Sequence, residues 1–341
     1  MRRHLIHLIL LMVVFSSCHS HHDVIPAFYY WKTIYKPTES ELQKLRALHC
    51  KRMYLRLFDV DRDAVTKQII PVAPLSARHL DTGFEYVPDI FITQKTVQTL
   101  TAAEIPALAD NINSYAQELC ANMSIVPPEI QMDCDWNSTT KDVYFALLKA
   151  LKERPFFKGK ALSCTIRLYQ AKYTLRNGIP PVEKGLLMCY NMGNLKKYGN
   201  DNSILDVSDT KEYLRYIDKY PLPLDIALPL FSWCVLFRGQ QYKGILREVS
   251  TESIASEHWL AKEKENLYRS TADTSWHGYH IQKGDKIRTE IVTYSDVKSI
   301  AAFTTRKVKN MSLNLVFFHC DSLILSKYTN HELETIIDCY R

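Results

Sequence analysis

Short β-rich runs alternate with amphipathic stretches along most of the chain, and this alternation is the feature that most constrains the fold. Strands separated by helices are typical of parallel βαβ units. Amphipathic segments occur at 39–51, 105–123, 139–154, 209–220 and 330–340. The β-rich runs cover residues 26–33, 52–60, 86–94, 129–136, 161–169, 185–192, 224–233 and 313–321.

Eight strands with intervening helices predict an α/β fold of the (β/α)8, or TIM-barrel, type, for which roughly 250 residues are typical. The chain has 341 residues. Most of the excess lies at 236–310, so we expect an insertion there, between strands seven and eight. The competing architecture is an open doubly wound sheet. That fold usually carries a glycine-rich phosphate turn, and the sequence shows none among its 10 glycines.

The N-terminus predicts export. Two arginines precede an apolar stretch at 5–15, which is too short to span a bilayer and is typical of a secretory signal. Ser16 and Ser17 precede Cys18, a pattern that resembles the bacterial lipobox. We therefore expect a signal peptide at 1–17, a lipid anchor on Cys18 to the membrane of the cell envelope, a tether at 18–25 and a barrel domain at 26–341. Plain secretion with an incidental cysteine is the alternative.

Charge and cysteine spacing argue against several classes of partner. The formal net charge is +6, but basic and acidic residues are mixed, so we expect no nucleic-acid partner. Of the cysteines after Cys18, several lie in apolar runs, and none forms a CxxC pair. We interpret most of them as reduced core residues, and we expect no metal site and no cofactor.

The run at 129–136 carries two carboxyls inside an apolar strand. Because side chains alternate along a strand, Ile130, Met132, Cys134 and Trp136 share the face expected to meet the helices. The other face carries Gln131, Asp133, Asp135 and Asn137, which would line the barrel interior and rise to its mouth. Two neighbouring aspartates repel, so one pKa should rise. The pair could serve acid–base chemistry, orient a ligand, or form a buried structural network with Arg56 or Arg167.

Two short motifs resemble those of family-18 glycoside hydrolases, the chitinase-like barrels. "DCDWN" at 133–137 is similar to their strand-four D-x-D-W-E signature, and "MCYN" at 188–191 is similar to their strand-six M-x-Y-D signature. "RLFDVD" at 56–61 also resembles a run in glycosidase-like barrels of bacterial lipoproteins. The strand-three S-x-G-G signature is absent, and the first aspartate of the longer strand-four motif falls on Ile130.

The resemblance implies a carbohydrate ligand and assigns roles by position. Asp133 and Asp135 would be the inner aspartate and the aspartate that orients the substrate. Tyr190 and Asn191 would contact the sugar. The general acid of the family would fall on Asn137, whose amide cannot donate a proton in that role.

The other strand ends supply further candidates for the mouth. Asp59 could be a second carboxyl beside Asp135, as glycoside hydrolysis requires, although helix capping is the alternative for Asp59, Asp61 and Asp321. Trp31 and Trp233 could stack on sugar rings or pack in the core. Substrate-binding candidates are Asn137, Tyr190, Asn191, Trp233, Arg56, Arg167 and Gln94, with Trp31 as a further stacking surface.

Three functions remain open on this sequence. The first is a glycoside hydrolase whose catalytic residues are Asp135, Asp133 and Asp59, with Asp135 or Asp59 donating the proton. The second is a glycan-binding lipoprotein that kept the cleft but lacks the acid, as Asn137 suggests. The third is an envelope scaffold whose mouth residues are structural.

Overall fold

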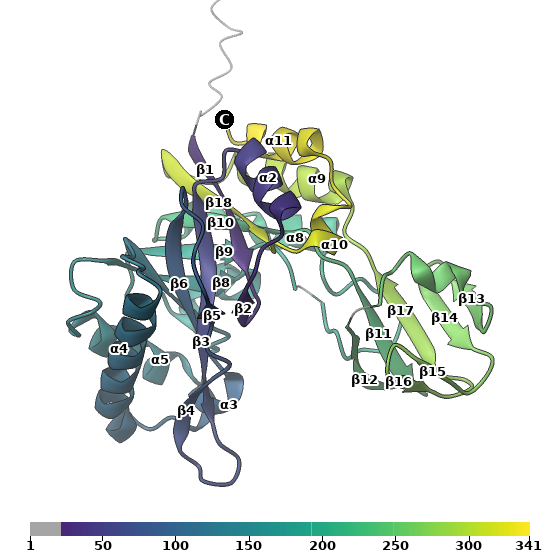
Figure 1. The fold of residues 1–341 in the computed structure, drawn as a ribbon, viewed down its shortest axis with the longest axis horizontal. Coiled ribbons are helices and arrows are strands. Elements are labelled where there is room, and N and C mark those ends of the chain that lie inside the picture. Colours follow the sequence, from purple (N-terminus) through teal and green to yellow (C-terminus); the bar gives the residue numbers. More distant parts are fainter. Residues whose placement is uncertain (1–21, 192, 248) are drawn as a thin grey trace, which may run out of the picture.

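The computed structural model describes residues 22–191, 193–247 and 249–341, and their parallel strands close into a barrel (Figure 1). β1 pairs with β18 on one side and with β3 on the other, which closes the ring. The predicted barrel is therefore confirmed. Its strands are β1 (Asp23–Tyr30), β3 (Arg52–Arg62), β6 (Glu85–Ile92), β7 (Glu129–Cys134), β8 (Ala161–Arg167), β9 (Lys184–Met188), β10 (Leu224–Pro229) and β18 (Ser312–Phe318).

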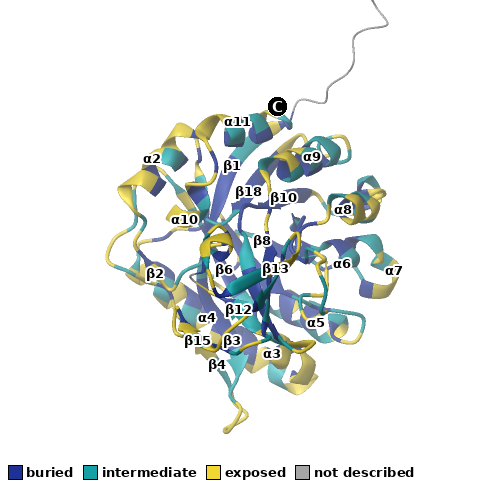
Figure 2. Cartoon of the chain, turned by 90° about the vertical axis from the view of Figure 1, so that its right-hand side faces the viewer, coloured by how far each residue is buried: buried dark blue, intermediate teal, exposed yellow. Residues whose placement is uncertain are grey.

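Helices surround the barrel and turn their exposed faces outward (Figure 2). Several begin at threonine caps, which satisfy free backbone N–H groups. Thr38, Thr293 and Thr329 each accept from the backbone of the third helical residue. The helices are α2 (Glu39–Ala47), α3 (Gln94–Thr99), α4 (Ile105–Asn122), α5 (Lys141–Lys152), α6 (Leu168–Lys172), α7 (Thr174–Asn177), α8 (Val207–Leu214), α9 (Tyr294–Thr304), α10 (Ser322–Leu325) and α11 (Asn330–Asp338).

Between β10 and β18 the chain forms a separate antiparallel sheet, which we call the insert (residues 233–290). It has its own apolar core, in which Trp259 and Trp276 contact each other with ring centroids 5.3 Å apart. Because it follows the carboxyl end of β10, it lies on the mouth side of the barrel, in front of the ring in Figure 2. Its sheet comprises β11 (Trp233–Arg238), β12 (Gln241–Leu246), β13 (Leu260–Lys264), β14 (Leu267–Ser270) and β17 (Lys286–Glu290), beside a hairpin of β15 (Thr274–Trp276) and β16 (Tyr279–Ile281).

The bounds of two predicted segments differ from the structure. The insertion expected at 236–310 includes α9, which contacts α8, α11 and β10 and so belongs to the helix ring. The tether expected at 18–25 overlaps β1, because Asp23 to Ile25 already pair with β18. The signal peptide at 1–17 and Cys18 lie outside the described residues.

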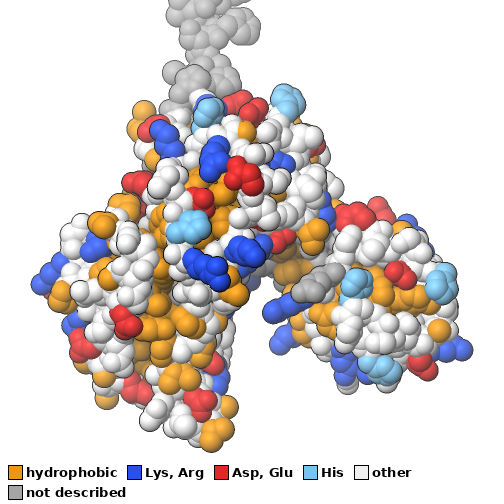
Figure 3. Space-filling view, in the orientation of Figure 1, with side chains coloured by type: hydrophobic (Ala, Val, Ile, Leu, Met, Phe, Trp, Pro, Cys, Tyr) orange, Lys and Arg blue, Asp and Glu red, His pale blue; other side chains and the backbone are white. Residues whose placement is uncertain are grey.

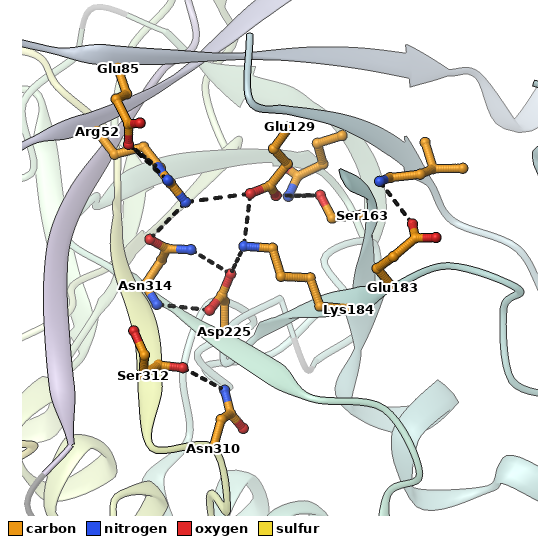
Figure 4. Close-up of polar contacts among 12 residues, drawn as sticks. Arg52, Glu85, Glu129, Ser163, Glu183, Lys184, Asp225, Asn310, Ser312 and Asn314 are labelled. Carbon is orange, nitrogen blue, oxygen red and sulfur yellow. Dashed lines mark hydrogen bonds and ion pairs between the residues drawn. The ribbon is translucent and has the colours of Figure 1, made fainter. Parts of the chain in front are cut away.

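Opposite the mouth, an ionic layer that we call the base network fills the barrel (Figure 4). Lys184 Nζ lies 2.7 Å from carboxylate oxygens of both Glu129 and Asp225. Arg52 pairs with Glu85 at 2.8 Å and also reaches Glu129. Glu129 and Asp225 are buried, and a buried charge requires a paired, hydrogen-bonded partner. The base of the barrel is therefore a closed, charged floor.

The described ends of the chain meet beside this floor. The backbone N–H of His22 donates to the carbonyl of Tyr340 at 3.1 Å, and both ends lie at the top of Figure 1. His22 is buried and its Nδ1 lies 2.7 Å from the Asn310 carbonyl oxygen.

Eight cysteines of the described chain are free, and all but Cys339 are buried, as predicted for core residues. In the same residues, we find no helix with the length and apolarity needed to cross a bilayer.

Candidate functional site

A cavity of about 180 Å³ lies at the carboxyl ends of the strands, where function gathers in barrels. Its wall combines aromatic rings with a small set of charged and amide groups. It is smaller than the roughly 300–1,000 Å³ of pockets for drug-sized ligands, so it suits one small ring. Its lining residues are Tyr29, Trp31, Phe91, Asp133, Asp135, Arg167, Met188, Tyr190, Asn191 and Phe318.

The two predicted aspartates of the β7 run both line this cavity, but in different surroundings. Asp133 accepts a 2.5 Å hydrogen bond from Thr165 Oγ1. Burial, reinforced by the charge of Asp135, raises the pKa of Asp133 to about 7. Asp135 pairs with Arg167 at 2.8 Å. The pair therefore offers one carboxyl that titrates near neutral pH and one that is held by a cation.

Arg167 connects both sides of the cavity. One guanidinium nitrogen binds Asp135, and the other donates to the Asn191 carbonyl at 2.8 Å. Asn191 has a left-handed backbone with φ of 56°, and its side-chain Oδ1 has no hydrogen-bond partner among the described residues. A buried amide oxygen without a partner is costly, and a ligand hydrogen could satisfy it.

Aromatic rings form the rest of the wall. Tyr190 contacts Phe318 at 5.6 Å and Phe231 at 5.9 Å between ring centroids. Burial raises the pKa of the Tyr190 phenol well above its usual value, so the phenol keeps its proton. Trp31 lies 5.6 Å from Phe318. These faces can stack on the apolar side of a sugar ring.

Asn137 lies outside the cavity lining, contrary to its predicted place on the inward face. Its Oδ1 accepts from the N–H of Thr139 at 2.8 Å and from the hydroxyl of Thr139 at 2.7 Å. Its own N–H donates to Thr140 Oγ1 at 3.0 Å. This turn leads into α5, so the residue at the expected position of the general acid serves the start of a helix. Trp136 does face outward as predicted, and stacks on Tyr144 at 5.3 Å.

Four other predicted site residues lie around the cavity but do not line it. Arg56 forms an ion pair with Asp59 and lies over Trp31, 5.6 Å from the ring centroid. The Gln94 side chain donates to the backbone carbonyl of Asp135. Trp233 contacts Phe231 at 5.1 Å, one residue removed from the wall. Arg56, Gln94 and Trp233 therefore contact residues in or next to the lining, and Asp59 is joined to them through Arg56.

The remaining strand-end acids have local partners. Asp321 caps α10 and pairs with Lys32 at 2.8 Å. Asp61 accepts from Thr93 at 2.7 Å. Asp321 is therefore a helix cap, which was the alternative expected for it.

Asp89 of β6 was not among the predicted site residues. It is completely buried, and neither carboxyl oxygen has a hydrogen-bond partner among the described residues. Burial, with the charges of Asp133 and Asp59 nearby, raises the pKa of Asp89 well above its ordinary value. The available signal was a lone charge in the apolar run "YVPDIFI". Over the described ranges, no group of three or more His, Cys, Asp or Glu side chains could hold a metal ion.

Comparison with known proteins supports the architecture. No protein-family model matches the chain, and no curated protein matches it. Among solved structures, the spore cortex-lytic enzyme SleL of Bacillus cereus has a TM-score of 0.55 at 13% identity, covering 94% of this chain and 75% of that one.

Two family-18 enzymes have similar TM-scores and sequence identities to this chain. A mutant chitinase of Cycas revoluta, solved in complex with (GlcNAc)4, has a TM-score of 0.56 at 11% identity, covering 93% of this chain and 100% of that one. An N-acetylglucosaminidase of Paenibacillus barengoltzii has a TM-score of 0.50 at 12% identity, covering 92% and 99%. At these identities the likeness concerns the fold, and the chain is a (β/α)8 barrel of the kind found in family-18 glycoside hydrolases.

Proposed function

We propose that this protein binds a glycan containing N-acetylated sugars at the barrel mouth and does not cleave it. The observation that carries the proposal is Asn137, an amide at the position of the general acid whose side chain is held in the turn before α5. Family-18 barrels of the same fold include a chitinase solved with (GlcNAc)4, which supports the class of ligand.

The cavity offers what a single sugar ring needs. Trp31 and Phe318 supply apolar faces, and the phenol of Tyr190 is a hydrogen-bond donor. The Asn191 Oδ1 can accept from a ligand hydroxyl or amide N–H. The space-filling surface is open between the barrel and the insert (Figure 3), so the rest of an oligosaccharide can extend into solvent.

Calorimetric titration with GlcNAc oligosaccharides, beside an assay for released reducing ends, tests the proposal. We expect the wild type to bind without releasing sugar. Asp135→Asn should weaken binding at least about tenfold, or 1.4 kcal/mol, because the ion pair with Arg167 is lost. Asp61→Asn, at a carboxyl outside the cavity lining, is the matched control and should bind as the wild type does. Absence of binding, or turnover by the wild type, would contradict the proposal.

Hydrolysis is the second candidate, and the raised pKa of Asp133 favours it. A carboxyl with a pKa of about 7 is present in both protonation states at neutral pH, as a general acid requires. Turnover that disappears in Asp133→Asn would establish this alternative.

We also propose that the protein is exported and anchored in the cell envelope through a lipid on Cys18. The basic and apolar start followed by Ser16, Ser17 and Cys18 supports this. Metabolic labelling with a fatty acid, compared between the wild type and Cys18→Ser, tests it. Equal labelling of both proteins would exclude Cys18 as the anchor site.

A further inference from the structure

The insert contacts the barrel through a buried ion pair on β17. Arg288 and Glu290 are 1% and 0% exposed and lie 2.7 Å apart. The guanidinium donates to the backbone carbonyls of Lys197 at 2.7 Å and Leu195 at 3.1 Å. Glu290 accepts from both the N–H and the hydroxyl of Ser203, each at 2.6 Å. These hydrogen bonds therefore hold the loop that follows β9 against the insert.

We call Asn191 and residues 193–205 the wall loop, because its first residue lines the cavity. Its two arms are joined by hydrogen bonds from Asn191 N–H to the Ile204 carbonyl at 2.7 Å, and from Gly193 N–H to the Ser203 carbonyl at 3.2 Å. A Cβ on Gly193 would lie 2.8 Å from the Cα of Ser203, so the arms are in direct backbone contact. Ser203 therefore lies directly against the arm that begins at Asn191.

From Asn191 the contacts continue to the charged groups of the cavity. The Asn191 carbonyl accepts from Arg167, and Arg167 pairs with Asp135. A continuous series of short contacts thus runs from Glu290 in the insert to Asp135 in the cavity.

A buried arginine–glutamate pair is favourable only when its hydrogen-bonding groups are satisfied. Arg288 meets this condition through backbone carbonyls of the wall loop, and Glu290 through Ser203. Phe237 packs against the guanidinium at 4.9 Å. One further contact joins the insert to the wall loop: Asn266 donates to the Asn200 carbonyl at 2.9 Å. Asn202 of the wall loop also donates at 2.8 Å to the carbonyl of Ile291, the residue that directly follows the insert.

We propose that Arg288 and Glu290 are positioning residues for the cavity, through which the insert holds the wall loop and fixes Asn191 and Arg167 in their binding geometry. This inference rests on the proposed glycan binding. Neither residue touches the cavity, so their effect on a ligand is indirect.

The test compares Arg288→Met with Arg238→Met. Arg238 also forms an ion pair within the insert, with Asp285 at 2.8 Å. Among the described residues its guanidinium donates to Asp285 and His280 and not to the wall loop. Each full-length variant is titrated with (GlcNAc)4, and amide hydrogen exchange is followed at Asn191 and Gly193 without ligand. We expect Arg288→Met to weaken binding about tenfold, within the usual range of coupling between sites, and to speed exchange at both amides. Arg238→Met should change neither.

Two further variants separate positioning from general destabilisation. Arg288→Lys keeps the charge and part of the hydrogen bonding, and should restore part of the affinity. Gly193→Ala displaces Ser203 from within the wall loop and keeps both residues of the ion pair, and it should weaken binding while exchange in the hairpin of β15 and β16 stays as in the wild type.

If Arg288→Met binds (GlcNAc)4 as tightly as the wild type does, the positioning role is wrong. Unchanged exchange at Asn191 and Gly193 would also overturn it. Either result would leave the proposed function intact. Absence of binding by the wild type would overturn both.

Discussion

Asp133 makes the stability of this protein depend on pH. Its folded pKa of about 7 lies above the value of about 3.9 for an unperturbed aspartate. Between these values the folded state holds a proton that the unfolded state has lost, so stability falls as pH rises from about 4 to 7. The burial of this carboxyl therefore costs stability at neutral pH.

We expect Asp133→Asn to remove this pH-dependent part of the unfolding free energy. From pH 5 to pH 8 the wild type should lose about 3 kcal/mol more of its unfolding free energy than the variant does. Urea unfolding at both pH values measures the difference. Asp142→Asn, at an exposed carboxyl of α5, is the control and should follow the wild type. Parallel pH profiles for wild type and Asp133→Asn would contradict the assignment.

At the same scale, strand alternation predicted the inward direction of Asp133 and Asp135 but not that of Asn137. Alternation holds only while the chain stays extended, and β7 ends at Cys134. Beyond it, hydrogen bonds in the turn before α5 decide where Asn137 points. Asp89 has no hydrogen-bond partner among the described residues. This depends on the side chains of neighbouring strands, so it could not be predicted from the sequence of β6 alone.

At the scale of elements, one lysine links three strands of the base network through ion pairs. Lys184 of β9 is the cation between Glu129 of β7 and Asp225 of β10. Among the described residues, Lys184→Met would leave Asp225 without a cation, and Glu129 with Arg52, at 3.4 Å, as its remaining cation beside the hydrogen bond from Ser163. Breaking a buried pair in this way typically costs about 3–5 kcal/mol.

Urea unfolding of Lys184→Met measures this loss. The matched control is Lys152→Met, because Lys152 pairs with Glu183 at 2.7 Å on the surface, where a pair contributes about 1 kcal/mol or less. Similar losses in the two variants would show that the base network does not stabilise the barrel.

Elements with a long periodic pattern were predicted best. The barrel strands are buried on both faces and appear in the sequence as continuous apolar runs, and the five predicted amphipathic segments correspond to α2, α4, α5, α8 and α11. The segment of α9 was assigned to the insertion, because it follows the sheet of the insert along the chain. Only its packing against α8 and α11 identifies it as part of the ring.

At the scale of the whole molecule, the barrel and the insert have separate apolar cores. We expect the insert to open before the barrel does, because its core is much the smaller. Trp259→Ala should destabilise the insert by about 3–5 kcal/mol and leave the barrel core unchanged. Hydrogen exchange with mass spectrometry should then show faster exchange in peptides from 233–290, while peptides from β7 and β8 stay protected. Equal loss of protection in both would indicate one cooperative unit.

The meeting of His22 and Tyr340 beside the base network has a consequence for how the molecule faces its surroundings. Cys18 stands only a few residues before β1 in the sequence, and β1 begins at the end of the barrel opposite the cavity. A protein attached there presents its mouth away from the supporting bilayer. It would therefore meet polymers arriving from the medium, or lying in a layer beyond the membrane, in preference to the sugars of the lipids beneath it.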